Sequence, residues 1–340
     1  MKLALIVPAP FAAISGGYLY DRRMVEGLRA LGHAVDVVEL PGRHPLPDAV
    51  AEAAARDALP AGATAVIDGL CLPAFAPDAV RNAVGLIHHP TALETGLDAD
   101  ALREKERALF PAMRRIIATS RLTAQRLVSD FGVTAGRIGV VEPGTDPAAR
   151  ATGRAMSPGA PVHILSVGTL VPRKGHDVLL RALGRLTDLE WTLTIVGEPR
   201  DPVHAHGLTA LAEELGIARR VNFAGGATNE ALEAAYTAAD IFALATHWEG
   251  YGMAAAEALA RGLPCAITAG GAIADVVPPA ACVLAQPGDH ASLSRALRRV
   301  IYDPALRAQM AEAAWEAGQS LPRWADRAAA FITELERADG

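Results

Sequence analysis

Two glutamates, Glu249 and Glu257, stand eight positions apart in the segment HWEGYGMAAAEALARGLPC, residues 247–265. An apolar run precedes the segment, Gly250 and Gly252 permit a close-approaching backbone, and the alanine-rich run after them predicts a helix. The pattern therefore places Glu249 in a loop beside a helix N-terminus and Glu257 inside the helix.

This placement indicates a ligand that is anionic in one part and rich in hydroxyls in another. The free N–H groups of a helix N-terminus favour a phosphate, and ionised carboxylates accept hydrogen bonds from hydroxyl groups. A diphosphate between a sugar and a ribose meets both demands. The competing interpretation is that Glu249 caps the helix and Glu257 is solvated.

A second candidate is the segment SVGTLVPRKGHDVLLRAL, residues 166–183, in which a strand runs into Gly168. Arg173 and Lys174 follow in the loop, before a predicted helix that begins near Asp177. Adjacent cations at such a turn can neutralise a diphosphate and stabilise charge developing on it as a leaving group. The competing interpretation is a solvated basic loop.

Two further candidates lie in the first half of the chain. Gly16 and Gly17 follow the first apolar run in what we interpret as a turn before a helix, where backbone can approach a ligand. His88 and His89 end a later strand, which points one imidazole toward the edge where open sheets bind ligands. The alternatives are that Gly16 and Gly17 form a turn without a role in binding, and that the histidine has a structural role.

Short apolar runs alternate with helical patterns along the whole chain, which predicts parallel sheets covered by helices on both faces. Six strands are expected in each half: 3–7, 34–38, 65–67, 84–87, 115–119 and 138–141, then 163–167, 192–196, 220–223, 240–246, 265–268 and 282–284. We predict a first Rossmann-like domain over 1–146, a linker over 147–161, a second Rossmann-like domain over 162–318, and a C-terminal helical segment over 319–340. Ligand should bind where the carboxyl ends of the strands meet.

Composition restricts the function classes. The net charge of −6 argues against nucleic acid as the main partner, and three scattered cysteines favour a reducing cytoplasm over a disulfide framework or zinc site. No apolar run is long enough to span a membrane, and early prolines argue against reading the opening run as a secretory signal. The basic segment 102–115 leaves a membrane-surface contact open, with a solvated face as the favoured interpretation.

Taken together, these residues resemble the family 4 retaining glycosyltransferases, also called group 1, of the GT-B fold. The resemblance is carried by the two glutamates, by the VGTLVPRKG turn, by IVGE at 195–198 and by GGAIADVV at 270–277. Two positions depart from the family: Thr169 stands where many members carry Arg, and Asp275 where Glu is frequent.

The resemblance implies that Glu249 contacts the transferred sugar, Glu257 the ribose, and Arg173 and Lys174 the diphosphate. It matches the family's histidine to His88 rather than His89, and it implies that the C-terminal helix returns to the first domain across a cleft between two facing domains. The residues predicted to act in catalysis are His88, Arg173, Lys174 and Glu249. Those predicted to bind the donor are Gly16, Gly17, Gly168, Arg173, Lys174, Gly250, Tyr251, Gly252 and Glu257.

The activity implied is transfer of a sugar, with retention, from a nucleotide-diphosphate sugar to a hydroxyl of a lipid, glycan or small molecule. UDP is favoured over GDP, and the transfer is predicted to be independent of metal and of any other cofactor. The alternatives are a GT-B-fold sugar-nucleotide epimerase and a non-catalytic sugar-binding protein. The sequence indicates neither the acceptor nor the oligomeric state, and it leaves open a location on the inner face of a membrane.

Overall fold

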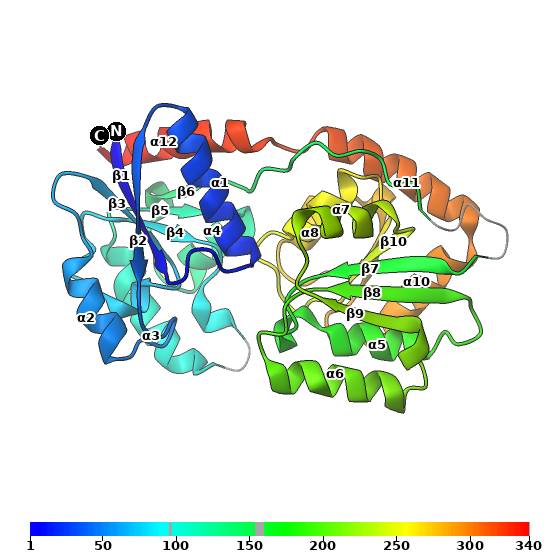
Figure 1. The fold of residues 1–340 in the computed structure, drawn as a ribbon. Coiled ribbons are helices and arrows are strands. Elements are labelled where there is room, and N and C mark those ends of the chain that lie inside the picture. The colour runs from blue at the N-terminus through cyan, green and yellow to red at the C-terminus, as the bar shows by residue number, and fades with distance from the viewer. Residues whose placement is uncertain (95–96, 154–159, 340) are drawn as a thin grey trace. The chain divides into compact units, whose positions relative to one another are not determined.

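The fold consists of two compact units, each built around one parallel sheet (Figure 1). The computed structural model describes residues 1–94, 97–153 and 160–339. The first unit (unit 1) comprises residues 1–144 and 322–340, and the second (unit 2) comprises residues 145–321. Residues 154–159 of the predicted linker lie outside the described residues, and residues 147–153 belong to unit 2.

Six strands form the described sheet of unit 1, in the order β2-β1-β3-β4-β5-β6. They are β1 (Lys2–Pro8), β2 (Ala34–Leu40), β3 (Thr64–Asp68), β4 (Val84–Ile87), β5 (Arg115–Ala118) and β6 (Ile138–Val140). The helices of this unit are α1 (Gly16–Ala30), α2 (Ala49–Asp57), α3 (Ala99–Leu109), α4 (Arg121–Ser129) and α12 (Trp324–Asp339).

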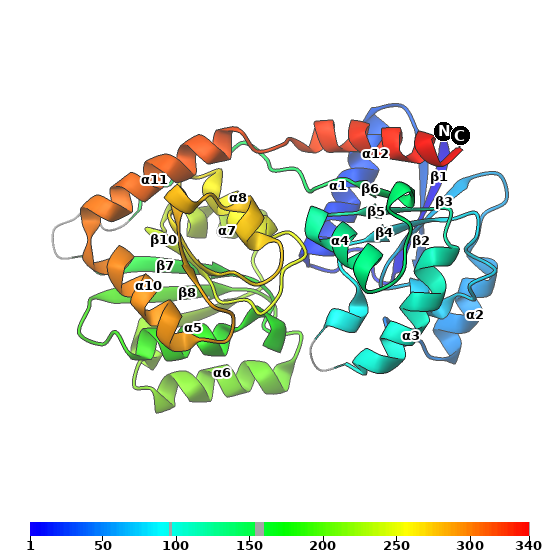
Figure 2. The ribbon, with the colours of Figure 1, turned by 180° about the vertical axis from the view of Figure 1, so that it is seen from behind.

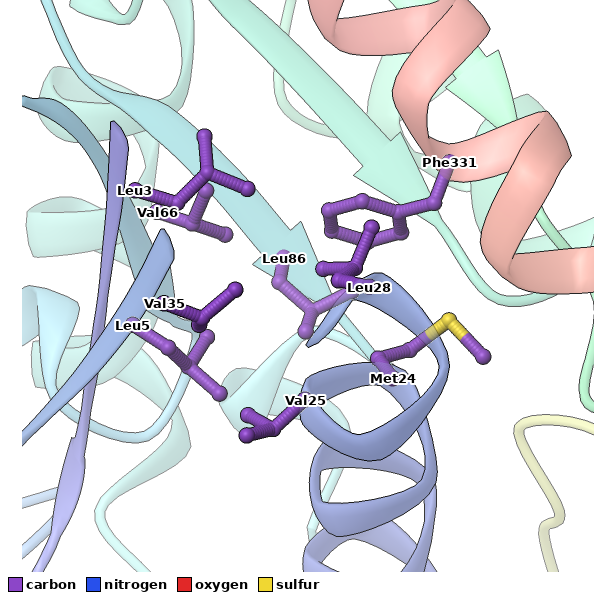
Figure 3. Close-up of a pocket in the computed structure, with 9 residues that line it drawn as sticks. All are labelled: Leu3, Leu5, Met24, Val25, Leu28, Val35, Val66, Leu86 and Phe331. Carbon is purple, nitrogen blue, oxygen red and sulfur yellow. The ribbon is translucent and has the colours of Figure 1, made fainter. Parts of the chain in front are cut away.

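Alternation along β1 separates two cores in unit 1, because successive side chains of a strand point to opposite faces. Leu3 and Leu5 pack with helices α1 and α12, and Figure 3 shows Phe331 of α12 directed toward the same apolar group as Met24 of α1. Ile6 belongs to the opposite core, which α2, α3 and α4 cover. The C-terminal helix is therefore part of the core of unit 1.

The described sheet of unit 2 also has six strands, in the order β12-β11-β10-β7-β8-β9. They are β7 (Val162–Val167), β8 (Trp191–Val196), β9 (Val221–Gly225), β10 (Ile241–Leu244), β11 (Cys265–Thr268) and β12 (Cys282–Ala285). The helices are α5 (His176–Gly184), α6 (Pro202–Glu214), α7 (Asn229–Thr237), α8 (Met253–Leu259), α9 (Ile273–Val276), α10 (His290–Tyr302) and α11 (Pro304–Gln319).

Helices cover both faces of this sheet as well (Figure 2). One core joins the sheet to α5, α6 and α10, and the other joins it to α7, α8, α9 and α11. Trp191 of β8 is 1% exposed and anchors the first core, while Phe242 of β10 lies in the second. All twelve predicted strands are present, with ends shifted by at most two residues. Within the described residues, no helix has the length and apolar character needed to cross a membrane.

Candidate functional site

The strand order of unit 2 reverses its direction of growth between β7 and β10, which lie side by side at the centre of the sheet. Ligands of such sheets bind outside the carboxyl ends of the strands at this switch point. The segments that follow β7 and β10 are held together there by backbone: His247 N donates to the carbonyl oxygen of Arg173 at 2.8 Å. The two motifs singled out in the sequence therefore meet at one point of unit 2.

Arg173, Lys174 and Glu249 form a cation–carboxylate cluster at this point, in which Glu249 is buried and the two cations are partly buried. Lys174 Nζ lies 2.5 Å from Glu249 Oε1, and Arg173 Nη1 lies 3.8 Å from the same oxygen while donating to Trp248 O at 2.7 Å. Their side chains are only 14%, 15% and 10% exposed, in the order Lys174, Arg173, Glu249. The alternative of a solvated basic loop is therefore wrong.

The charges in this cluster are stabilised by one another. Burial by itself raises the pKa of Glu249, but the charges of Lys174 and Arg173 and a hydrogen bond from Lys174 outweigh it, so the pKa of Glu249 falls below its ordinary value. Glu249 is consequently ionised at neutral pH. An incoming diphosphate would compete with this carboxylate for the two cations.

Two glycines allow the loops to approach this closely. Gly175 has φ +63°, and a Cβ there would lie 2.1 Å from the carbonyl oxygen of Ala245. Gly271 has φ +75°, and a Cβ there would lie 2.2 Å from Glu249 O. Glu249 and Gly271 form a parallel bridge, so the glycine pair of the GGAIADVV segment fixes the backbone of the buried carboxylate.

Glu249 does not cap the following helix, contrary to the alternative considered above. The N-cap of α8 is Gly252 with φ 105°, and no side chain hydrogen-bonds that cap. Tyr251 beside it is 8% exposed, and Gly250 is half-buried. The helix has only seven residues, so the cluster of side chains and the glycine backbone define this site more than the helix end does.

Glu257 is half-buried in α8 and is not a freely solvated position. Its Oε2 accepts a hydrogen bond from the hydroxyl of Tyr236 at 2.9 Å, and Tyr236 itself is fully buried. The guanidinium of Arg261 lies 4.5 Å from the centre of the Tyr236 ring and donates to Glu257 O at 2.8 Å. The carboxylate of Glu257 is therefore held in one place by its neighbours.

Gly168 lies at the end of β7 beside the cations. A Cβ at this position would come within 3.2 Å of the Lys174 side chain, and its carbonyl oxygen lies 3.2 Å from His176 Nε2. His176 is buried, and burial lowers its pKa to about 4, so the ring is neutral at physiological pH. It therefore adds no charge to the site.

Unit 1 has its own switch point, between β1 and β3, and a second polar cluster lies there. His88 Nε2 lies 3.1 Å from Asp21 Oδ1 and 3.3 Å from Asp68 Oδ2. Both carboxylates are almost completely buried, whereas the His88 side chain is 19% exposed. His89 is engaged elsewhere, because its Nε2 lies 2.6 Å from Glu94 Oε1.

The glycine pair predicted as a turn is in fact the start of α1. Ser15 is the N-cap, and its hydroxyl accepts from Tyr18 N at 3.4 Å, so Gly16 and Gly17 are the first two helical residues. A Cβ on Gly17 would lie 3.4 Å from His88 Cδ2. The structure thus brings Gly17 and His88 together, although it assigns the glycines to a different element.

Three residues of these clusters were not among the site residues predicted from the sequence: Asp21, Asp68 and Tyr236. Asp68 could have been found, because it is the last residue of β3 and so lies at a binding edge. Asp21 carried a weaker signal, an acidic residue on the buried face of an amphipathic helix. Tyr236 carried none, since an aromatic residue in a helix is typical of a core.

The basic segment 102–115 uses its apolar side inside unit 1. Leu109, Phe110 and Met113 are each 2% exposed or less and belong to the core that α3 covers. Glu106 is also buried, and it accepts hydrogen bonds from Thr91. The favoured interpretation, in which only the polar side of this segment faces solvent, agrees with this packing.

Comparison with known proteins agrees with this architecture. Residues 155–317 match the family described as glycosyl transferases group 1. A D-inositol 3-phosphate glycosyltransferase of Mycolicibacterium gilvum (strain PYR-GCK) is 40% identical over 169 residues, which are 47% of this chain and 38% of that protein. The chain thus aligns with well under half of that relative's length.

Solved structures also resemble the whole chain. Sucrose-phosphate synthase from Thermosynechococcus elongatus has a TM-score of 0.81 at 22% identity, covering 99% of this chain and 98% of that one. Anabaena Alr3699/HepE, solved in complex with UDP-glucose, has a TM-score of 0.75 at 16% identity, covering 99% of each chain.

Two Rossmann-like parallel-sheet units and these neighbours define a GT-B fold, as predicted. The region 155–317, which carries the cation–carboxylate cluster and Glu257, belongs to the glycosyl transferases group 1 family, and the predicted resemblance to that family is confirmed.

Proposed function

We propose that this chain is a retaining glycosyltransferase that moves a sugar from a nucleotide-diphosphate sugar to a hydroxyl acceptor. The observation that carries the proposal is the cation–carboxylate cluster of Arg173, Lys174 and Glu249 at the switch point of a unit that belongs to the group 1 family. UDP is the favoured nucleotide, since a structural neighbour was solved with UDP-glucose.

The roles follow from the chemistry of each group. Arg173 and Lys174 hold the diphosphate and stabilise it as it leaves, which is the main electrostatic contribution to catalysis. Once the phosphates occupy these cations, the Glu249 carboxylate accepts hydrogen bonds from the transferred sugar. Glu257, held by Tyr236, accepts them from the ribose, and His88 contacts substrate from unit 1.

The remaining donor contacts are backbone contacts. Gly168 flanks the phosphates at the end of β7, and Gly250, Tyr251 and Gly252 present their amides before α8. Gly16 and Gly17 let the start of α1 approach the substrate. These assignments predict that adding side chains at the glycines weakens donor binding without removing any charged contact.

The mechanism we propose is a front-face reaction in which the leaving diphosphate helps to deprotonate the acceptor hydroxyl. It requires no metal, because Arg173 and Lys174 supply the positive charge. The configuration of the product, determined by NMR of the anomeric proton, tests retention. Transfer abolished by a chelator and restored by a divalent cation would contradict the metal-independent route.

Donor binding is tested by thermal shift with a panel of nucleotide sugars, because a ligand that binds only the folded state raises stability by mass action. We expect UDP-sugars to raise the melting temperature and Glu257→Ala to reduce that rise. The matched control is Glu312→Ala, whose side chain is 62% exposed and pairs with Arg150. An undiminished shift in Glu257→Ala would show that the ribose assignment is wrong.

Transfer itself is tested by following the bound nucleotide sugar with lipid, glycan and small-molecule acceptors. Release of nucleotide diphosphate together with a glycosylated acceptor supports the proposal. Conversion of the nucleotide sugar without any acceptor would instead identify an epimerase. Binding without either reaction would identify a non-catalytic sugar-binding protein.

A further inference from the structure

Two buried carboxylates converge on a single ring nitrogen in unit 1. The nearest carboxylate oxygens of Asp21 and Asp68 lie 3.1 Å and 3.3 Å from His88 Nε2. Within the described residues, His88 is the one group able to carry positive charge that lies within ion-pair distance of either carboxylate. Two acids of this kind are costly to bury unless they share a cation or a proton.

Among the described residues, no second cation forms an ion pair with these acids. Tyr20 packs edge-on against the His88 ring with centroids 5.2 Å apart, and its hydroxyl donates to Val141 O at 2.9 Å. Cys71 is buried nearby, where burial and the two carboxylates raise the pKa of its thiol, so the thiol is neutral. Burial raises the pKa of the Tyr20 hydroxyl well above its ordinary value, and the positive charge of Arg327 of α12 offsets only part of this rise.

We propose that Asp21 and Asp68 are positioning residues that keep His88 as an imidazolium ion, with Nε2–H held by both carboxylates and Nδ1–H left to donate to a substrate oxygen. This proposal depends on the proposed function in one respect: the oxygen that accepts from Nδ1–H belongs to a substrate of the proposed glycosyl transfer. It assigns His88 the role of a cationic hydrogen-bond donor. A neutral ring held at Nε2–H would instead present a basic Nδ1 and could act as a general base.

A second buried histidine in the same protein shows what the carboxylates change. His176 faces a backbone carbonyl and no acid, and burial lowers its pKa to about 4. Burial acts on His88 in the same direction, yet the two aspartates reverse it and raise the pKa of His88 to about 10. Asp21 has one oxygen that is buried without a partner, and burial raises its pKa to about 7 despite the His88 charge.

The consequence for the reaction is that His88 cannot accept the proton of the acceptor hydroxyl at neutral pH. That proton must leave by another route, which agrees with its capture by the departing diphosphate. The imidazolium instead withdraws electron density from whichever substrate oxygen it contacts. Gly17 lies next to the ring, since a Cβ there would be at ordinary contact distance, 3.4 Å, from His88 Cδ2.

The experiment is a pH titration of the full chain labelled with ¹³C and ¹⁵N at histidine, with His88 assigned by His88→Gln. In the unsubstituted protein we expect the His88 ring to stay protonated from pH 6 to pH 9. In Asp21→Asn, Asp68→Asn and the double variant we expect its midpoint to fall, by roughly two pH units or more in the double variant. The matched control is Asp78→Asn, whose side chain is 85% exposed, and it should leave the midpoint unchanged.

Two results would overturn the proposal. One is a His88 ring in the unsubstituted protein that is neutral at pH 7, a measurement that stands even if the variants fail to fold. The other is a stoichiometric divalent cation in the purified protein whose removal by a chelator shifts the His88 signals, which would identify a metal site. The titration needs no donor and no turnover, so a failure to find glycosyl transfer leaves its result unaffected.

A kinetic readout separates positioning from a merely structural role. If transfer depends on the imidazolium, the alkaline limb of the pH profile of kcat/KM should move to lower pH in Asp68→Asn, in step with the His88 midpoint. A profile that keeps its shape while only its height falls would contradict the link between protonation and transfer.

Discussion

The substitution Glu249→Gln tests the cation–carboxylate cluster most directly. It removes a charge that faces both Lys174 Nζ at 2.5 Å and Arg173 Nη1 at 3.8 Å, so two cations whose side chains are under 20% exposed lose their interaction with this carboxylate. Removing one partner of a buried pair costs about 3–5 kcal/mol, and the retained amide oxygen favours the lower end of that range. At roughly 2–4 °C per kcal/mol for a unit of this size, the melting temperature should fall by roughly 6–12 °C.

The assay is thermal unfolding followed by circular dichroism, with and without UDP. The control is Glu312→Gln, which breaks the exposed pair with Arg150 and should cost under about 1 kcal/mol. UDP should stabilise Glu249→Gln more than the unsubstituted protein, because its phosphates replace the missing charge. Glycosyl transfer should nevertheless be lost, since Gln cannot accept as strongly from the sugar hydroxyls.

The stability lost in Glu249→Gln should depend on pH in a defined direction. The pKa of Glu249 in the folded protein is lowered, so its contribution is complete above the unfolded pKa of about 4.3 and disappears as pH falls through the folded pKa. The stability difference between the two proteins should therefore be constant near neutral pH and shrink in acid. A Glu249→Gln variant that melts together with Glu312→Gln at pH 7 would refute this account of the cluster.

Three further predictions follow from the same site. Arg173→Ala and Lys174→Ala should each weaken UDP binding by about 1.5–3 kcal/mol, or roughly 10- to 150-fold in Kd by calorimetry, and an unchanged Kd for both would contradict the diphosphate assignment. Both Gly271 and Gly32 have positive φ, +75° and +85°, but a Cβ on Gly271 would lie 2.2 Å from a backbone oxygen whereas one on Gly32 would meet open space. Gly271→Ala should therefore lower the urea midpoint more than Gly32→Ala. Equal losses would show that the close contact adds nothing to the cost of the positive φ. His176→Leu should flatten the stability profile between pH 6.5 and 4, because the folded pKa of about 4 makes the parent lose up to roughly 3 kcal/mol as pH falls through that window. An unflattened profile would show that His176 is not buried in neutral form.

The strands could be predicted from the sequence because each is a short run of Val, Ile, Leu or Ala between turn residues. The match at β4 and β11 is complete: the polar residue His88 follows the first run, and Pro264 precedes the second. At β10 the predicted strand over 240–246 was too long. Asp240 uses its carboxylate to accept from His163 N at 2.8 Å, and the residues after Leu244 turn into the site loop.

The prediction of a turn at Gly16 and Gly17 was wrong because it used only the low helix propensity of glycine. Glycine disfavours a helix interior, so Gly16 and Gly17 were interpreted as a turn. In the first turn of a helix, however, the amides have no intrahelical partner and the cap residue governs the start. Ser15 is that cap residue in α1, and because it directly precedes Gly16 the helix start could have been predicted from the sequence.

The pairing of distant polar groups could not be predicted at all. Asp21 and His88 lie on a helix and a strand end separated by 67 residues, and neither position has a periodicity that indicates its partner. The same is true of Tyr236 and Glu257, which come from α7 and α8. Such contacts depend on how helices lie over the sheet, which hydrophobic spacing leaves open.

The packing of α12 into unit 1 has a consequence for how the chain is made. Residues 1–144 leave the ribosome long before Phe331 and Leu335, which are 1% and 0% exposed in the finished core, have been synthesised. The buried pair of Arg115 and Glu334 is also incomplete until then. Unit 1 therefore cannot complete its core until α12 has been synthesised, so a ribosome that stalls or a protease that cleaves near residue 322 would leave the earlier-made domain with an open apolar face.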